Sequence, residues 1–265
     1  MRYLRIILLN FQRAVEIRSR SFVWFLLALV PPFTMIIFWN GATSGGRVID
    51  GTWTFQLLAS YYLFILIVGV FAMSHIEEEV ALIDIKEGGI SPYLLKPFSY
   101  FWMKLFAEMP HRFIQGGFGI VAIFIVTIFF RDIVVFTHSW LIFSLSVACL
   151  MLAYVLSFTL KMTVGILAFW LTEIRGMFEV MEVVILILGG ILMPLTLYPK
   201  LLEQISYVLP FGYIIYFPVI AFQGQLSAIS LLQVLAGQLM WIVVFGFLYK
   251  WLWRAGIRKY SAIGQ

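Results

Sequence analysis

Three ionisable residues stand close together in an otherwise apolar part of the sequence, and they are the first candidates for chemistry. Arg175, Glu179 and Glu182 are separated by four and three residues, so a helix would place them on one face. Charged side chains are costly inside a membrane and often mark a pathway for an ion or a substrate. Glu179 and Glu182 are therefore candidates for a translocation pathway or for a polar contact between subunits. The alternative, which we favour for Arg175 and Glu179, is an ion pair that only anchors the helix at the membrane surface.

The motifs of common catalytic sites are missing from the sequence. No Lys is followed by Ser or Thr, so the chain lacks the phosphate-binding loop of nucleotide hydrolases. It also lacks the H-E-x-x-H and G-x-S-x-G patterns of two large hydrolase classes. His75, His111 and His138 are far apart, and we expect the single cysteine, Cys149, to pack in the core. We therefore predict that this chain is not an enzyme and holds no cofactor or metal.

The composition predicts a polytopic membrane protein. Of the 265 residues, 63% are hydrophobic and only 12% are charged, and the mean hydropathy is +1.01. A soluble domain of this size cannot bury so much apolar side chain. The formal net charge is +5, but the basic residues lie beside apolar runs, which fits membrane topology better than binding to nucleic acid. We expect an all-α fold embedded in a lipid bilayer.

Apolar runs of about 20 residues are long enough to cross a bilayer, and the sequence contains six of them. An amphipathic helix over residues 1–21, with most of its arginines on one side, is expected to lie in the interface before a single transmembrane domain over residues 22–265. The run over residues 139–171 permits two interpretations. It is either a single long tilted helix, or a span that ends at Lys161 and continues as a segment along the interface. The predicted spans are residues 22–39, 57–74, 112–130, 139–171, 173–195 and 228–253.

The basic residues predict the orientation of the spans. Six spans put both termini on the same side of the membrane, together with residues 77–97. Fifteen of the eighteen Lys and Arg residues lie in segments on that side, which is therefore the cytoplasm by the positive-inside rule. The exceptions are Arg47, Arg131 and Lys200, and the segments expected in the cytoplasm are residues 1–21, 75–112, 161–175 and 250–265.

The longest polar run, residues 77–97, indicates a segment that lies outside the membrane. Its first half favours a short helix, and Gly88 with Gly89 provides a C-terminal stop. Ser91 and Pro92 are typical of the start of a new helix, the serine as a side-chain cap and the proline in the first turn. We expect this segment to contact a partner in water. The charges expected to be exposed are Asp84, Lys86 and Glu87.

Residues 194–227 are too rich in proline for a spanning helix and too apolar for a free loop. Irregular backbone at membrane depth is tolerated only where it is buried in protein or lines a wet cavity. We therefore predict an outer re-entrant helical hairpin, with a short amphipathic helix over 199–208, a turn over 209–212 and a second half-helix before Gly224. As a cap on a translocation path it would act as a gate. The predicted gate residues are Pro194, Pro199, Pro210, Phe211, Tyr213 and Pro218.

Two passages carry a resemblance to a known family. One is DIKEGGISPYLLKP, residues 84–97, and the other is GGILMPLTLYPKLLEQISYVLPFGYIIYFPVIAFQG, residues 189–224. They resemble the cytoplasmic coupling element and the outer hairpin of the permease subunits of type-two ABC exporters. The likeness covers essentially the whole chain, although the acidic triplet at residues 77–79 departs from the family pattern.

The resemblance implies a permease that moves a hydrophobic or amphipathic cargo, such as a lipid-linked molecule, a natural product or a glycan, out of the cytoplasm. The expected location is the cytoplasmic membrane of a bacterium or an archaeon. ATP and Mg would be bound by a separate ABC ATPase, present in two copies beside two permeases that are identical or homologous. The residues expected to couple to the ATPase are Asp84, Lys86, Glu87, Gly88, Gly89, Leu95 and Pro97.

Two other functions remain open. A secondary transporter could use Glu182 as a proton relay, but the inverted repeat and paired broken helices of such transporters are not visible in the sequence. A membrane enzyme is the weaker alternative because the catalytic motifs are missing. A neighbouring gene for an ABC ATPase would favour the exporter over both.

Overall fold

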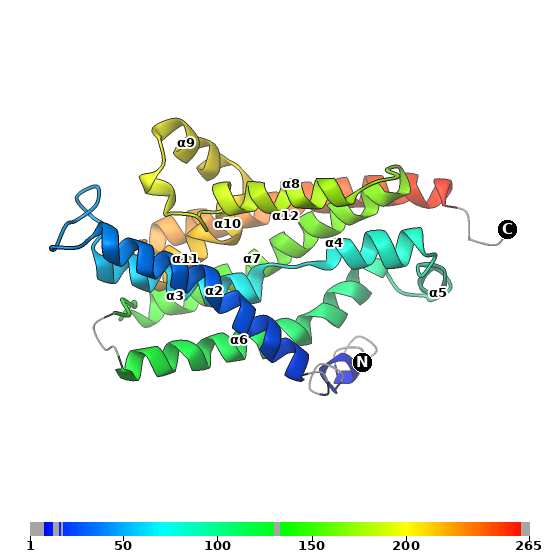
Figure 1. Cartoon of the computed structure of the whole chain (residues 1–265). Helices are drawn as coiled ribbons and strands as arrows, with labels where there is room; N and C mark the ends of the chain where they lie inside the picture. Colours follow the sequence, from blue (N-terminus) through cyan, green and yellow to red (C-terminus); the bar gives the residue numbers. More distant parts are fainter. Residues whose placement is uncertain (1–7, 13–15, 17, 130–132, 261–265) are drawn as a thin grey trace.

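The computed structural model describes residues 8–12, 16, 18–129 and 133–260. They form an elongated bundle whose long helices run along its length (Figure 1). The predicted all-helical fold is confirmed, and the described residues contain no β-strand. Most of the predicted interfacial helix over residues 1–21 lies outside the described residues, so that helix stays a prediction.

The helices follow the predicted order of spans and connections. The first half of the chain contains α2 (Arg18–Ala42), α3 (Phe55–Ala72), α4 (Ile76–Glu78), the π-helical segment η1 (Glu79–Lys86), α5 (Ser91–Leu94) and α6 (Tyr100–Phe129). The second half contains α7 (Trp140–Gly165), the 3-10 segment η2 (Ile166–Phe169), α8 (Arg175–Leu188), the 3-10 turn η3 (Leu195–Leu197), α9 (Lys200–Val208), α10 (Pro210–Ile214), α11 (Tyr216–Phe222) and α12 (Ala228–Lys259).

Five helical stretches of the described chain are long and apolar enough to cross a membrane. They are α2, α3 with its continuation to Lys86, α6, α7 with η2, and α12. The predicted outer hairpin is the bent pair of α9 with α10 and α11, which meet at 66° and would make a sixth span only if they crossed together. Five of the six predicted runs therefore contain a long apolar helix.

The fifth predicted run, residues 173–195, contains a shorter helix than expected. α8 has 14 residues and a length of roughly 21 Å, whereas the hydrocarbon core of a bilayer is about 30 Å thick. The helix ends because Gly189 and Gly190 follow it and Gly190 adopts a left-handed conformation with φ +81°. Non-helical chain follows it up to η3.

Residues 139–171 form one continuous helix with a tightened end. α7 passes through Lys161 without interruption and continues directly into η2. The chain therefore forms one long helix here with no break at Lys161, in agreement with the first interpretation. Lys161 does not stop the helix because its side chain is buried against acidic partners and does not need water.

α3 lies at the centre of the bundle, and most of its residues are buried, including Tyr61 and Tyr62. It packs against α2, α6, α7 and α11. In contrast, α2, α6 and α12 expose large apolar side chains such as Ile37, Phe124 and Phe247. An apolar outer surface is what contact with lipid requires, because the hydrocarbon region offers no partner to polar groups.

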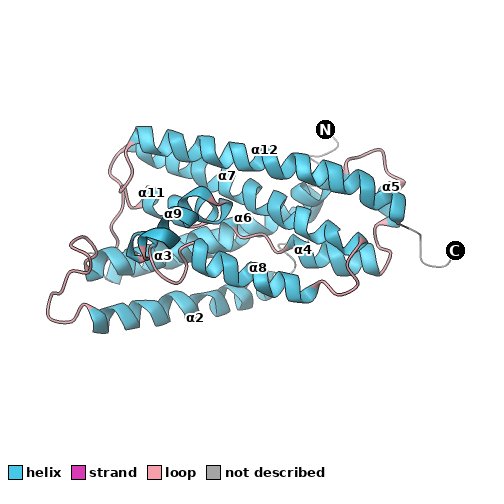
Figure 2. Ribbon diagram, turned by 90° about the horizontal axis from the view of Figure 1, so that it is seen from above, coloured by secondary structure: helices cyan, strands magenta, loops and turns pink. Residues whose placement is uncertain are grey.

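The two ends of the bundle differ in character (Figures 1 and 2). We call one the basic end, where α4, α5 and the end of α12 lie. We call the other the hairpin end, which carries the loop of residues 43–54, α9 and the start of α12. The basic end contains Lys86, Lys96, Arg254, Arg258 and Lys259.

Candidate functional site

The polar segment that follows α3 is packed on the bundle and does not project freely into water. α4 contacts α7, and η1 contacts η2. Glu77 and Asp84 are buried, and only 3% of the Asp84 surface is exposed. The prediction that Asp84 is an exposed charge is therefore wrong. A buried carboxylate is tolerated when it is paired, and two lysines from the long helices supply the partners.

The first partner is Lys161 of α7, which is 1% exposed. Its ammonium group donates hydrogen bonds to Oε1 of Glu77 in α4 and to Oε1 of Glu182 in α8, the second at 2.5 Å. We call these three residues the Lys161 cluster. Two carboxylates thus share one ammonium group, and the cluster joins three elements that are far apart in the sequence.

The second partner is Lys104 of α6, which is 2% exposed. Its ammonium group contacts Glu79 and lies 2.5 Å from Oδ2 of Asp84. The Tyr100 hydroxyl donates a hydrogen bond to the same Asp84 oxygen. We call Lys104, Glu79, Asp84 and Tyr100 the Lys104 cluster. It fixes η1 to the first turns of α6, which precede the predicted span of residues 112–130.

A third polar group holds the connection between α3 and α4. The Ser74 hydroxyl donates to Oε2 of Glu108 at 2.9 Å, and Arg112 Nε donates to Oε1 of the same carboxylate at 2.9 Å. Arg112 also lies 3.5 Å from Nδ1 of His75. The Ser74 backbone N–H donates to the Ser157 hydroxyl on α7 at 3.0 Å. Side chains between Ser74 and Asp84 thus attach the polar segment to α6, α7 and α8.

A glycine turn ends η1, as predicted. Gly88 has φ +81°, which an L-residue rarely adopts. A Cβ on Gly89 would lie 2.9 Å from the carbonyl oxygen of Ile83, so the turn is also close-packed. The predicted side-chain cap of the next helix is wrong: Ser91 does not cap α5, and its hydroxyl lies 3.0 Å from that of Tyr260.

The part of the segment that reaches the surface is its tip, which we define as residues 86–97. Lys86, Glu87 and Pro97 are exposed, and Leu95 is 87% exposed. The Lys86 ammonium group donates to the carbonyl oxygen of Leu171. Four of the seven predicted coupling residues are therefore exposed at the basic end, Gly88 and Gly89 shape the turn, and Asp84 is buried.

The predicted ion pair on α8 does not form. Arg175 and Glu179 are both exposed, and no ion pair joins them in the part of the chain that the structure describes. The Arg175 backbone N–H instead donates a hydrogen bond to Oε1 of Glu173 at 3.1 Å. Of the two predicted pathway residues, Glu179 and Glu182, it is Glu182 that pairs with the buried Lys161.

The hairpin has the predicted first helix, but the predicted turn over residues 209–212 is wrong, because Pro210 occupies the first position of α10 and the helices break at Leu209 and Ile215. Pro199 precedes α9, Pro210 begins α10, and Pro218 lies in α11. α9 exposes most of its residues, whereas α10 and α11 are largely buried. Tyr213 packs directly on the backbone of α12, where a Cβ on Gly237 would lie 2.4 Å from its ring. Phe211 is partly buried and Pro194 is buried at the start of η3.

Neutral side chains satisfy the irregular backbone next to the hairpin. The Tyr61 hydroxyl donates to the carbonyl oxygen of Gly190 at 2.6 Å, and the Tyr62 hydroxyl donates to that of Leu192 at 2.8 Å. Gln238 Nε2 donates to the carbonyl oxygens of Tyr213 at 2.9 Å and Cys149 at 3.0 Å. Such bonds are needed because an unpaired carbonyl at membrane depth is costly.

The outer loop also contributes to this end. Trp53 Nε1 donates to Oγ1 of Thr196 in η3 at 3.0 Å. The nearby Tyr198 hydroxyl is buried without a hydrogen-bond partner among the described residues, and burial raises the pKa of this phenol above its usual range. It therefore stays neutral, and every described contact between the loop and the hairpin is uncharged.

The sequence reasoning missed the two lysines at the centre of the clusters. Lys161 interrupts a long apolar run, and this was a usable signal, because an ionisable residue within a span usually has a buried partner. Lys104 is a weaker indication of a buried ion pair, because it lies in residues 75–112, a segment expected to be in water. Within the described residues, no group of His, Cys, Asp or Glu side chains could hold a metal ion.

Comparison with known proteins gives one family. The family model described as "ABC-2 family transporter protein" matches residues 29–264, which is nearly the whole of the 265-residue chain. No curated protein matches the chain.

Proposed function

We propose a function from one premise: this chain belongs to the ABC-2 family of transporter proteins. It is a multi-pass membrane protein and a permease of an ABC transporter. We infer that it exports a hydrophobic or amphipathic cargo, such as a lipid-linked molecule, a natural product or a glycan. In this proposal two copies of a separate ABC ATPase bind ATP and Mg, and the chain pairs with a second permease, identical or homologous, in a bacterial or archaeal cytoplasmic membrane with both termini in the cytoplasm.

The observation that carries the proposal is the attachment of the polar segment to the long helices. A permease without a nucleotide site of its own must receive movement from its ATPase through a cytoplasmic element. The Lys104 cluster attaches η1 to α6, and the Lys161 cluster attaches α4 to α7 and α8. Breaking a buried ion pair costs about 3–5 kcal/mol. When the ATPase displaces α4 and η1, helices α6, α7 and α8 should therefore move with them before the ion pairs break.

The tip supplies a surface for the ATPase. Lys86 and Glu87 offer charges, and Leu95 offers an apolar side chain that is almost fully exposed. Asp84 has a different role from the one first expected: it anchors η1 through Lys104 and does not contact the ATPase. The glycine turn at Gly88 and Gly89 keeps the tip close to the end of η1.

At the opposite end, the hairpin is the proposed outer gate. One copy contributes a broken pair of half-helices, and two permeases facing each other would close the path between them. Glu182 was the candidate proton relay of a secondary transporter. Its hydrogen bond from Lys161 favours an anchoring role instead, and this supports the exporter over that alternative.

The test uses candidate ABC ATPases from the genome that encodes this chain, each co-expressed with it and purified in proteoliposomes. The variant exchanges the charges of Lys86 and Glu87 (Lys86→Glu with Glu87→Lys). The matched control exchanges those of Lys200 and Glu203 on α9 in the same way. We expect the tip variant to lose co-purification and stimulated ATP hydrolysis while it inserts normally, and the control to keep both. Wild-type protein that never binds an ABC ATPase would contradict the proposed function, and equal behaviour of both variants would contradict the role of the tip.

A further inference from the structure

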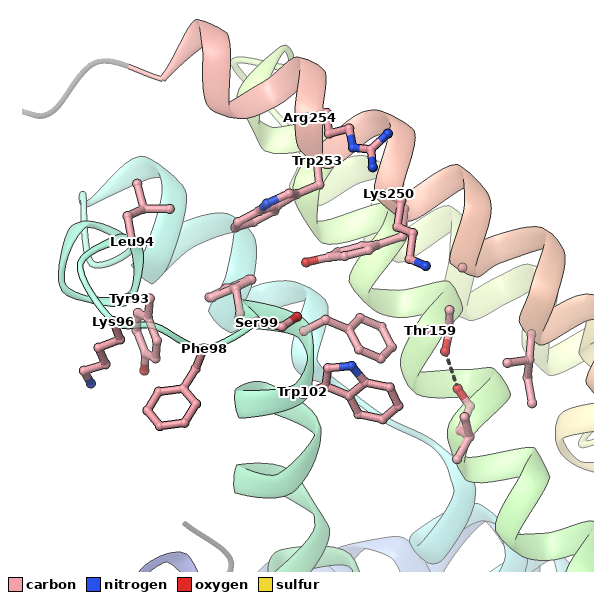
Figure 3. Close-up of a pocket in the computed structure, with 16 residues that line it drawn as sticks. Tyr93, Leu94, Lys96, Phe98, Ser99, Trp102, Thr159, Lys250, Trp253 and Arg254 are labelled. Atoms are coloured by element: carbon pink, nitrogen blue, oxygen red, sulfur yellow. Dashed lines mark hydrogen bonds between the residues drawn. The ribbon is translucent and has the colours of Figure 1, made fainter. Parts of the chain in front are cut away.

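A pocket of about 470 Å³ lies at the basic end between the α5–α6 connection and α12. Its walls are mainly aromatic: Figure 3 shows Tyr93, Phe98 and Trp102 on the side of α5 and α6, and Trp253 on the side of α12. Ligand pockets have volumes of roughly 300–1,000 Å³ and are mostly apolar with a few polar groups. The pocket has the size and lining of a binding site.

Three cations are among the residues that line this pocket. Lys96 lies on one side of the pocket and Lys250 and Arg254 lie on the other (Figure 3). The described residues that line it include no Asp or Glu. Unlike Lys104 and Lys161, none of the three forms an ion pair with any described residue. An aromatic pocket with unpaired cations is complementary to a ligand that is both apolar and anionic.

The pocket also lies at the level where a membrane surface is expected. Trp102 and Trp251 are exposed beside it, and exposed Trp residues are enriched at the boundary between hydrocarbon and water. Phe247, one turn earlier on α12 than Trp251, belongs to the apolar surface that faces lipid. These side chains place the pocket near the expected boundary between headgroups and hydrocarbon.

We propose that this pocket binds an anionic phospholipid from the leaflet at the basic end. The phosphate lies near Lys250 and Arg254, and the glycerol and the first part of the acyl chains lie against the aromatic rings. The rest of the chains stays in the bilayer. The lipid is a resident ligand and not the exported cargo, so this site stands independently of the proposed transport function.

The site is connected to the Lys104 cluster through one aromatic stack. The Trp253 ring stacks on the Tyr100 ring, with 4.8 Å between centroids and 11° between planes, and Tyr100 donates a hydrogen bond to Asp84. A lipid that packs on Trp253 therefore supports the side chain that holds Asp84. Occupancy of the pocket would steady the attachment of η1 to α6.

Two variants separate the proposed site from general attraction of lipid to a basic protein. Lys250→Gln with Arg254→Gln removes the two cations of α12, and the matched control, Arg258→Gln with Lys259→Gln, removes the same charge one turn further along the helix and outside the pocket lining. Gly246→Leu fills the pocket and keeps every charge, because nothing lies within 4 Å of a Cβ at Gly246.

The measurement is native mass spectrometry of the purified full chain titrated with dioleoyl phosphatidylglycerol or dioleoyl phosphatidylcholine. We expect phosphatidylglycerol to bind preferentially, and its affinity to fall about thirtyfold in the Lys250/Arg254 variant, from about 1 kcal/mol for each of the two basic residues near the lipid. Gly246→Leu should also lose binding, whereas the control pair and the charge-preserving Lys250→Arg with Arg254→Lys should keep it.

Three results would overturn the proposal. Equal binding of the two lipids would show that charge does not select the ligand. An equal loss in the control pair would show that the effect is general electrostatic attraction. Unchanged binding in Gly246→Leu would place the lipid outside the pocket. All of these can be read without the ATPase or any transport assay, so a failure here is distinct from a failure of the proposed function.

Discussion

The basic end and the hairpin end hold their buried polar groups in different ways. At the basic end, Lys161 joins carboxylates from α4 and α8, and Lys104 joins two carboxylates of η1 to α6. At the hairpin end, Tyr61, Tyr62 and Gln238 donate neutral hydrogen bonds to backbone carbonyls. Removing one partner of a buried ion pair costs about 3–5 kcal/mol, whereas a neutral hydrogen bond contributes about 1 kcal/mol. The difference suits a firm connection at one end and a gate that can open at the other.

The largest effect is expected when Lys161 is replaced. Lys161→Met leaves the buried Glu77 carboxylate without a counter-charge, and we expect the free energy of unfolding to fall by about 3–5 kcal/mol. Thermal unfolding in detergent, compared with the wild type, measures this. Adding Glu77→Gln and Glu182→Gln to the same variant should restore much of the loss, since no charge then remains unpaired. A Lys161→Met protein as stable as the wild type would show that the cluster does not hold the basic end together.

An intermediate effect is expected in the hairpin. Large-to-small changes at buried sites lower the free energy of unfolding by about 2–5 kcal/mol. Phe211 and Tyr213 are only partly buried. The loss in Phe211→Ala with Tyr213→Ala should therefore lie in the lower part of that range. Because these rings help to close the proposed gate, we expect dye leakage from proteoliposomes and basal ATP hydrolysis to rise. Phe247→Ala, on the lipid-facing side of α12, is the control. Lost stability without increased leakage would contradict the gate.

The smallest effect is expected from one tyrosine hydroxyl. Tyr61→Phe removes the donor to the Gly190 carbonyl oxygen, and an unsatisfied buried acceptor costs about 1–3 kcal/mol. We expect a loss near the lower value because the ring and its packing remain. The same unfolding measurement used for Lys161→Met gives the comparison directly. If the two variants were equally destabilised, the proposed contrast between charged and neutral ends would fail.

Signals that act over a few residues were read correctly from the sequence. The glycine stop at Gly88 and the helix that begins after Pro199 depend on backbone preferences that each residue carries by itself. The long apolar helices were equally accessible, because a bilayer sets their length and composition. These signals predicted the all-helical fold and the hairpin.

Signals that depend on a distant partner could not be read in the same way. Asp84 stands in a polar run and therefore looked exposed, but Lys104 of α6 and Tyr100 bury it. The sequence leaves open whether the span ends at Lys161. The partners of this lysine, Glu77 and Glu182, come from elements that only the folded chain brings together. The end of α8 at Leu188 could not be predicted from hydropathy, because the two glycines that follow leave the apolar character of the sequence unchanged.

The short α8 has a consequence for the lipid around the protein. Val180, Val183 and Leu186 form an exposed apolar surface on this helix, yet α8 is roughly 9 Å shorter than the hydrocarbon core. A bilayer beside a short apolar element thins to match it. The membrane next to α8 should therefore be locally compressed, and a polar headgroup would have less hydrocarbon to cross there than anywhere else along the bundle.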